Sequence, residues 1–175
     1  MAELFEDHSP LQLMAAGQWQ GREFTLVGRL QYKGETGAWT EWNALFDDGT
    51  VGVLGEDNGA YVFLMPAAML REVPQAAHFR VGATTAIEGK PYNVASNQQV
   101  SLVSAQGELP KLPALRQPFA MVELRSPDGE VLSIDYGSQP PQLSRGGSVR
   151  LEDLRLSGLR EDAAKEEQGR HFACP

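Results

Sequence analysis

Cysteine is almost absent from this chain of 175 residues, and the one present, Cys174, stands beside the C-terminus. No internal disulfide can form, so a reducing, cytoplasmic setting is expected. The chain also lacks the run of about 18 apolar residues that a membrane-spanning helix needs. Its first residues are acidic and contain no apolar run, so no signal peptide is expected. These absences together predict a soluble protein.

Basic residues are scarce as well. There are 15 Lys and Arg against 23 Asp and Glu, which gives a formal net charge of −8. Nucleic-acid binding draws on a basic face, and this chain has no run of Lys or Arg to provide one. We therefore expect no nucleic-acid partner, and we interpret the acidic surface as an aid to solubility.

Catalytic signatures are missing too. There is no Gly-x-Ser-x-Gly elbow, no P-loop and no Gly-x-Gly-x-x-Gly fingerprint. His8, His78 and His171 are scattered, and Cys174 has no base near it in the sequence. No catalytic residue is predicted, and we expect the protein not to be an enzyme and to hold no cofactor within these residues.

Glycine and proline, by contrast, are plentiful, with 18 and 11 residues. They fit many short strands joined by turns. Asp47-Asp48-Gly49, Asn58-Gly59 and Pro127-Asp128-Gly129 predict tight turns, and Gly146-Gly147-Ser148 is interpreted as a turn more than a phosphate cradle. Strands are expected at 24–32, 39–46, 51–54, 60–65, 79–81, 84–87, 92–95, 100–103, 119–124 and 131–136. Residues 66–74 are the best helical candidate but could equally be a loop, and the charged residues 160–168 are interpreted as a solvated helix or a tether. The fold class is therefore mainly β with few short helices.

The sequence predicts an N-terminal arm (1–16), a β domain (17–159) and a charged tether (160–175). Within the β domain, residues 21–26 resemble residues 89–94, and Asp48-Gly49 matches Asp128-Gly129. We therefore hypothesise two similar antiparallel β-subdomains, 12–66 and 79–137, which are barrel- or sandwich-like meanders packed together. The alternative is that any β protein repeats such turns.

Candidate binding residues gather in the first half of the β domain. They are Trp39, Glu41, Trp42, Asp57 and Asn58. If 39–42 is a strand, Trp39 and Trp42 point to opposite faces, so one can lie in the core while the other is exposed for binding or is covered by another element. Core positions for both are the more common arrangement. The acidic residues Glu41, Asp47, Asp48, Glu56 and Asp57 could converge on a divalent cation, although acidic Gly-containing turns form without any metal.

A family resemblance rests on short segments at 9–13, 16–17, 21, 24–32, 39–42, 46–49 and 56–59. They look like an uncharacterised bacterial family known as domain of unknown function 4178. The resemblance covers most of the chain and is strongest over 9–63. The family tends to have Trp-Leu-Ser-Glu where this chain has Val-Leu-Gly-Glu at 53–56, and it favours Gly where Met14 stands. The resemblance implies no established activity.

The resemblance does imply a context. Relatives often carry flanking Cys-x-x-Cys zinc ribbons, and the end of this chain, Cys174-Pro175, looks like the first half of one. On that interpretation the chain is a fragment, Cys174 is a metal ligand only as part of a truncated zinc ribbon, and zinc belongs to the full-length protein. A natural C-terminus is the alternative. Relatives also occur near genes for membrane-stress coiled-coil proteins and polyamine-synthase-like enzymes.

These observations favour a protein-interaction or scaffold module of a larger protein, with an unidentified protein partner and an exposed apolar or aromatic patch. The alternative is a domain that binds a small ligand or a divalent metal in a cleft between the two β halves, with Glu41 or Trp42 at its mouth.

Overall fold

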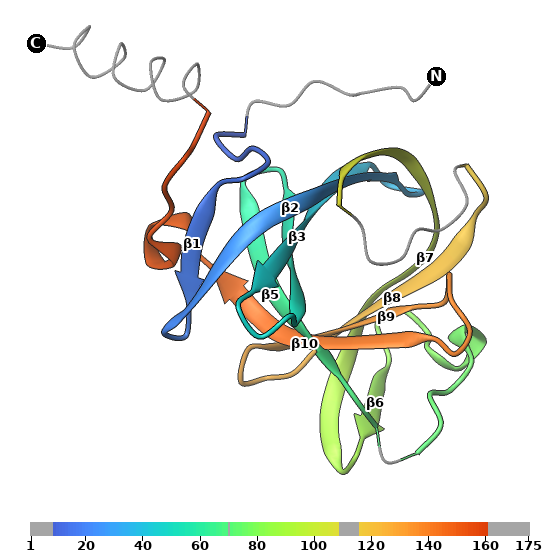
Figure 1. The fold of residues 1–175 in the computed structure, drawn as a ribbon. Coiled ribbons are helices and arrows are strands. Elements are labelled where there is room, and N and C mark those ends of the chain that lie inside the picture. Colours follow the sequence, from blue (N-terminus) through green and yellow to red (C-terminus); the bar gives the residue numbers. More distant parts are fainter. Residues whose placement is uncertain (1–8, 70, 109–115, 161–175) are drawn as a thin grey trace, which may run out of the picture.

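Short strands follow one another along most of this chain, as its glycines and alternating apolar residues predict. The computed structural model describes residues 9–69, 71–108 and 116–160. The strands of the first half are β1 (Ala16–Trp19), β2 (Arg22–Lys33), β3 (Ala38–Phe46), β4 (Val51–Asp57) and β5 (Ala60–Ala67). Those of the second half are β6 (Thr84–Ile87), β7 (Lys90–Gly107), β8 (Phe119–Arg125), β9 (Glu130–Asp135) and β10 (Gln142–Val149). Two 3-10 helices, η1 (Ala76–His78) and η2 (Leu151–Leu154), complete the described elements (Figure 1).

The strands form one antiparallel sheet that closes on itself. Its order is β1-β2-β3-β4-β5-β10-β9-β8-β7-β6, and an additional pairing joins β2 to β7. Eight strands, from β2 round to β7, therefore make a closed barrel, while β1 and β6 extend it as partners of β2 and β7. Figure 1 shows β10, in orange, crossing to run beside β5. The mainly β fold expected from the sequence is confirmed, and its form is a barrel.

Both halves of the chain contribute strands in the same order. β1 to β5 pair consecutively, and β6 to β9 do the same before β10 joins β9. The halves meet at two seams, where β2 pairs with β7 and β5 pairs with β10. Because all these strands belong to one sheet, an arrangement as two subdomains, 12–66 and 79–137, is not confirmed.

Buried apolar side chains gather in three clusters. The first belongs mainly to the first half of the chain and contains Leu11, Ala15, Phe24, Leu26, Trp42, Ala44, Phe46, Leu54, Phe63 and Leu154. The second belongs to the second half and contains Phe79, Ile87, Tyr92, Val94, Val122, Leu124, Leu132, Ile134 and Leu143. The third combines both halves and contains Leu30, Tyr32, Val100 and Leu102, with Trp39, Phe119 and Met121 packed against them.

The third cluster lies inside the barrel. Tyr32 on β2 meets Phe119 on β8 edge to face, with ring centroids 6.1 Å apart, although β7 separates these two strands in the sheet. Tyr32 pairs with Trp39 across β2 and β3, and Leu30 pairs with Glu41. Directly paired residues share a face of a sheet. Trp39 and Glu41 therefore point into the barrel.

Tight turns form where the sequence places Asn-Gly and Asp-Gly. Asn58 and Gly59 have φ angles of 50° and 81°, which is the left-handed geometry of a two-residue type I′ hairpin. Gly49 and Gly129 have φ angles of 88° and 92°, a region that residues with a Cβ rarely adopt. The predicted turns at these positions are confirmed.

Of the two alternatives for residues 66–74, a helix or a loop, the helix does not form. β5 continues to Ala67, and no helix precedes η1 in the part of the chain that the structure describes. Met69 and Val73 pack against the second cluster instead. The apolar spacing that suggested a helical face therefore reflects contacts made by extended chain.

Two further strand predictions and one turn prediction need correction. Residues 79–81 are not a strand, and Phe79 is buried in the second cluster by a bend of the chain. Residues 92–95 and 100–103 belong to one strand, β7, which is long enough to pair with β6, β8 and β2. Gly146-Gly147-Ser148, interpreted as a turn, lies within β10. A Cβ at Gly146 would overlap the backbone oxygen of Phe63, so the close approach of β10 to β5 requires glycine there.

The described residues before β1 and after η2 pack together against the barrel strands. Leu11 is 1% exposed within the first cluster, and the amide of Arg160 donates a hydrogen bond of 2.7 Å to the carbonyl of Pro10. Residues 9–15 thus pack against the β domain. The rest of the predicted arm (1–8) and most of the predicted tether (161–175), with Cys174, lie outside the described residues.

Candidate functional site

Two hollows lie in the barrel, and Glu41 and Val53 line both of them. The larger has a volume of about 900 Å³ and is bounded by β2, β3, β4, the end of β5, β9, β10 and the connection before β10. The smaller has a volume of about 340 Å³ and is bounded by β3, β4, β5, β7, β8 and β9. Eight-stranded barrels are filled by their own side chains or hold one small ligand. Here the third cluster fills only part of the interior.

Glu41 stands at the centre of the interior. One oxygen of its carboxylate accepts a hydrogen bond of 3.2 Å from the indole Nε1 of Trp39. Burial raises the pKa of Glu41 to about 7, against the lowering effect of that hydrogen bond, and the negative charge of Asp135 raises it further. Near neutral pH, Glu41 therefore exchanges between its neutral and ionised forms.

Asp135 and Tyr32 share the larger hollow with Glu41. Burial raises the pKa of Asp135, although one of its oxygens accepts a hydrogen bond of 2.7 Å from the amide of Gly137. The pKa of the Tyr32 hydroxyl is also raised, first by burial and then by the negative charges of Glu41 and Asp135. The interior thus holds a cluster of acidic groups from three strands, β2, β3 and β9, whose ionised forms are disfavoured.

Aromatic and apolar side chains form much of the remaining wall. Trp39 stacks on Tyr32 with ring centroids 5.6 Å apart and an interplanar angle of 20°. Leu30 and Val53 line the larger hollow. Asn43, which is 5% exposed, contributes a neutral amide to the same wall. Small-molecule sites combine apolar and aromatic walls with polar groups that orient the ligand.

The smaller hollow has an acidic mouth. Asp57 at the end of β4 and Glu123 on β8 both line it. Burial and the negative charge of Glu123 raise the pKa of Asp57. Arg125 supplies the one cationic side chain among the lining residues that the structure describes, and its Nε lies 2.8 Å from a carboxylate oxygen of Glu123.

The structure brings together three of the five predicted binding residues, because Trp39, Glu41 and Asp57 line the smaller hollow. Asn58 lies outside it, in the exposed hairpin turn after β4. Trp42 requires a correction: it is 1% exposed in the first cluster and cannot contact a ligand in the barrel. Alternation along β3 turns it to the face opposite Trp39, as the sequence predicts.

The acidic turns do not converge on a cation. Asp48 is exposed and paired with Arg22 at 2.8 Å, while Glu56 accepts hydrogen bonds from Trp42 and Tyr61. Within residues 9–69, 71–108 and 116–160, no group of three His, Cys, Asp or Glu side chains could hold a metal ion. The structure therefore gives the divalent-metal alternative no support.

Sequence reasoning missed Tyr32, Asn43 and Asp135. Each was interpreted only as part of a strand. They line a cavity because strands far apart in the sequence close into a barrel, and local sequence patterns do not reveal that closure. One signal was available for Asp135: in β9, Ser133 and Asp135 alternate with the buried apolar residues Leu132 and Ile134. Polar residues at alternate positions face either solvent or a polar interior.

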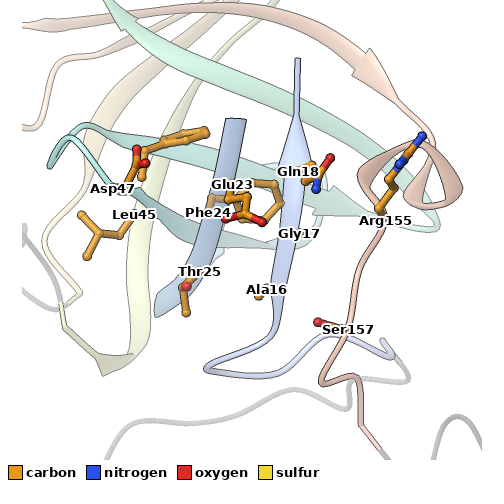
Figure 2. Close-up of a pocket in the computed structure, with 11 residues that line it drawn as sticks. Ala16, Gly17, Gln18, Glu23, Phe24, Thr25, Leu45, Asp47, Arg155 and Ser157 are labelled. Atoms are coloured by element: carbon orange, nitrogen blue, oxygen red, sulfur yellow. The ribbon is translucent and has the colours of Figure 1, made fainter. Parts of the chain in front are cut away.

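Another hollow, of about 540 Å³, lies outside the barrel beside β1 (Figure 2). Asp47 and Arg155 flank it on opposite sides of β1, with Glu23 and Gln18 between them. The side chains of Glu23, Asp47 and Arg155 are exposed, so water already solvates their charges. The barrel interior, with its buried acidic groups, is the stronger candidate site.

The described surface shows little of the apolar patch that an interaction module would need. Its large exposed hydrophobic residues are Met14 and Val81, at 70% and 60% exposure. Scattered single residues of this kind are common on monomeric proteins. No helix among the described residues has the length and apolar character to cross a membrane.

The raised pKa of Glu41 has a consequence for stability. The folded protein holds this proton more tightly than the unfolded chain, so the stabilisation is complete below pH 4.5 and is lost as pH rises through about 7. The Glu41→Gln variant should therefore be more stable than the wild type by roughly 2 kcal/mol at about pH 8 and similar to it at about pH 5. Urea unfolding at both pH values measures this.

The exposed Glu72 supplies the matched control. Glu72→Gln should leave the pH dependence of the unfolding free energy unchanged. Equal pH dependence in the wild type and in Glu41→Gln would mean that Glu41 titrates normally and is not buried in the barrel.

Comparisons with known proteins place the chain in a family. The family model described as "Domain of unknown function (DUF4178)" matches residues 12–151, which include every described strand of the barrel. No curated protein and no solved structure matches the chain. The resemblance drawn from the sequence is confirmed as to family, while flanking zinc ribbons are not shown. The chain belongs to the DUF4178 family of domains of unknown function.

Proposed function

We propose that the protein is a small-molecule-binding domain whose ligand occupies the interior of the barrel. The observation that carries this proposal is the hollow of about 900 Å³ in a closed eight-stranded barrel, with the half-buried carboxyl groups of Glu41 and Asp135 on its wall. Burying such groups is unfavourable unless something compensates them. A bound molecule would supply that compensation.

Binding rather than turnover fits the surroundings of Glu41. Within the described residues its carboxyl group has one hydrogen-bond partner, the indole of Trp39, and an indole N–H only donates. A side-chain nucleophile must lie within hydrogen-bonding reach of the base that activates it, and Trp39 cannot act as such a nucleophile. We therefore expect a ligand to be recovered unchanged after incubation with the protein.

The position of the cavity also favours a ligand site between two repeated halves. Arg22 pairs with Asp48 at 2.8 Å, and Lys90 pairs with Asp128 at 2.9 Å, at positions related by the sequence likeness between the halves. We infer that residues 16–67 and 84–149 are two copies of one five-stranded unit. A superposition that matches β1–β5 to β6–β10 in another register would contradict this. Ligand sites often lie at such junctions.

A blocked cavity tests the proposal. Val53 lines both hollows, so Val53→Trp places an indole in the space that the ligand would occupy. Val81→Trp makes the same change at an exposed position and serves as the control. A set of small metabolites with cationic, neutral and anionic members is screened by thermal shift and saturation-transfer NMR against all three proteins.

At least one compound should bind the wild type and Val81→Trp, and should fail to bind Val53→Trp. If Val53→Trp does not fold, Ser144→Phe blocks the larger hollow instead. Compounds that bind all three proteins equally, or a screen without any binder, would refute a ligand site in the barrel.

A further inference from the structure

The ionisable side chains that line the larger hollow are all acidic. Glu41 and Asp135 are its carboxyl groups, and none of its described lining residues is Lys, Arg or His. In the smaller hollow, Arg125 is already paired with Glu123. An anionic ligand would therefore meet like charges without a cation to hold it, whereas a cation would meet unpaired acidic groups.

Hydrogen bonding at these groups is incomplete. Within the described residues, Glu41 accepts one hydrogen bond, from Trp39, and Asp135 accepts one, from the amide of Gly137. A carboxylate has two oxygens and room for about four hydrogen bonds. Each group thus retains an oxygen that can accept from a ligand donor, and an ammonium group offers three donors together with the compensating charge.

The neighbouring wall suits an organic cation. Trp39 lines the smaller hollow beside Glu41, and its ring stacks on Tyr32, which lines the larger one. Aromatic faces attract cations and also pack against the carbon skeleton that carries them. A bare metal ion fits less well, because no group of three ligating side chains occurs among the described residues.

We propose that the ligand of the barrel is a small organic cation with a protonated amine, which Glu41 and Asp135 bind while Trp39 and Tyr32 contact its carbon skeleton. This inference rests on the proposed function, since it names the class of ligand for the same cavity. Binding converts Glu41 to its ionised form, so affinity increases as pH rises through about 7. The titratable groups that share a hollow with Glu41 are Tyr32 on β2 and Asp135 on β9 in the larger one. In the smaller one they are Glu56 and Asp57 on β4 and Glu123 and Arg125 on β8.

Three probes with one skeleton separate the charge of the ligand from its shape: benzylammonium, benzyl alcohol and benzoate. Their affinities for the wild type, Glu41→Gln and the surface control Glu72→Gln are measured by saturation-transfer NMR at neutral pH. Benzylammonium should bind best and should shift the indole N–H resonance of Trp39. Glu41→Gln should weaken its binding at least ~10-fold, because a charge-assisted hydrogen bond is lost, and should leave benzyl alcohol unaffected. Glu72→Gln should change neither.

Asp135→Asn, measured in the same way, provides a second variant should Glu41→Gln fold poorly. Failure of benzylammonium to bind, or equal binding of benzyl alcohol or benzoate, would overturn the inference of a cation. In either case the proposed ligand site in the barrel would still be supported if another compound bound the wild type and Val53→Trp abolished its binding. Binding of benzylammonium that persists in Val53→Trp would place it outside the barrel and overturn both.

Discussion

Replacing Trp42 by alanine should lower the free energy of unfolding by about 3–5 kcal/mol, the range for truncating a large buried aromatic side chain. Trp42 is 1% exposed among the residues of the first cluster. Its indole Nε1 also donates a hydrogen bond of 3.1 Å to Glu56, and that carboxylate would lose a partner. Urea unfolding followed by circular dichroism measures the loss.

Trp39→Ala is the matched control, since it removes the same side chain from the same strand. Trp39 is partly exposed and borders the smaller hollow, so its loss leaves less of a void in packed core. We expect about 1–2 kcal/mol from the apolar area that it buries. Equal losses in the two variants would contradict the assignment of Trp42 to the core and of Trp39 to the cavity wall.

The second large effect is expected at Gly146. Alanine there should destabilise the protein by about 3 kcal/mol or more, at the upper end for overpacked sites, because its Cβ would overlap the backbone oxygen of Phe63 on β5. The strand pairing of β10 with β5 is one of the two seams that close the barrel. The overlap must therefore be relieved by moving one strand of that seam.

Gly147→Ala provides the comparison one residue away. The nearest atom to its added Cβ would be the carbonyl oxygen of Gly129 at 3.3 Å, a tight contact that a small shift relieves. We expect a change below about 1 kcal/mol. If both alanine variants unfold at the same urea concentration, β10 does not approach β5 as closely as the structure indicates.

Local signals in the sequence were enough to locate most strands and turns. Asn58-Gly59 and Asp128-Gly129 predict hairpins because glycine adopts positive φ at little cost, and both form. The opposite orientations of Trp39 and Trp42 follow from the two-residue period of a strand. These features depend only on neighbours along the chain.

Features that depend on distant residues could not be predicted in this way. Gly146 and Gly147 read as a turn because glycine weakens an isolated strand, yet the crowding of β10 against Phe63 makes Gly146 necessary there. The segment 66–74 has the apolar spacing of a helix, but extended chain satisfies the same contacts. In both cases a tertiary contact outweighs the local preference.

The candidate site likewise combines residues that local signals identify with residues that only distant contacts bring to it. Glu41 and Trp39 were selected from one short segment as acidic and aromatic residues close together. Asp135 and Tyr32 join them only because β2 pairs with β7 and thereby closes the barrel. Burial by that closure disfavours the ionised form of Glu41 and shifts its pKa to about 7. The proposed site is thus a product of closure, and no single segment of the chain contains it.

A crystal structure of the protein with bound benzylammonium tests the proposed site most directly. We expect the ligand inside the barrel, with its ammonium group in hydrogen-bonding distance of Glu41 or Asp135 and its ring against Trp39 or Tyr32. An interior filled by the protein's own side chains, with the ligand on the outer surface, would contradict it.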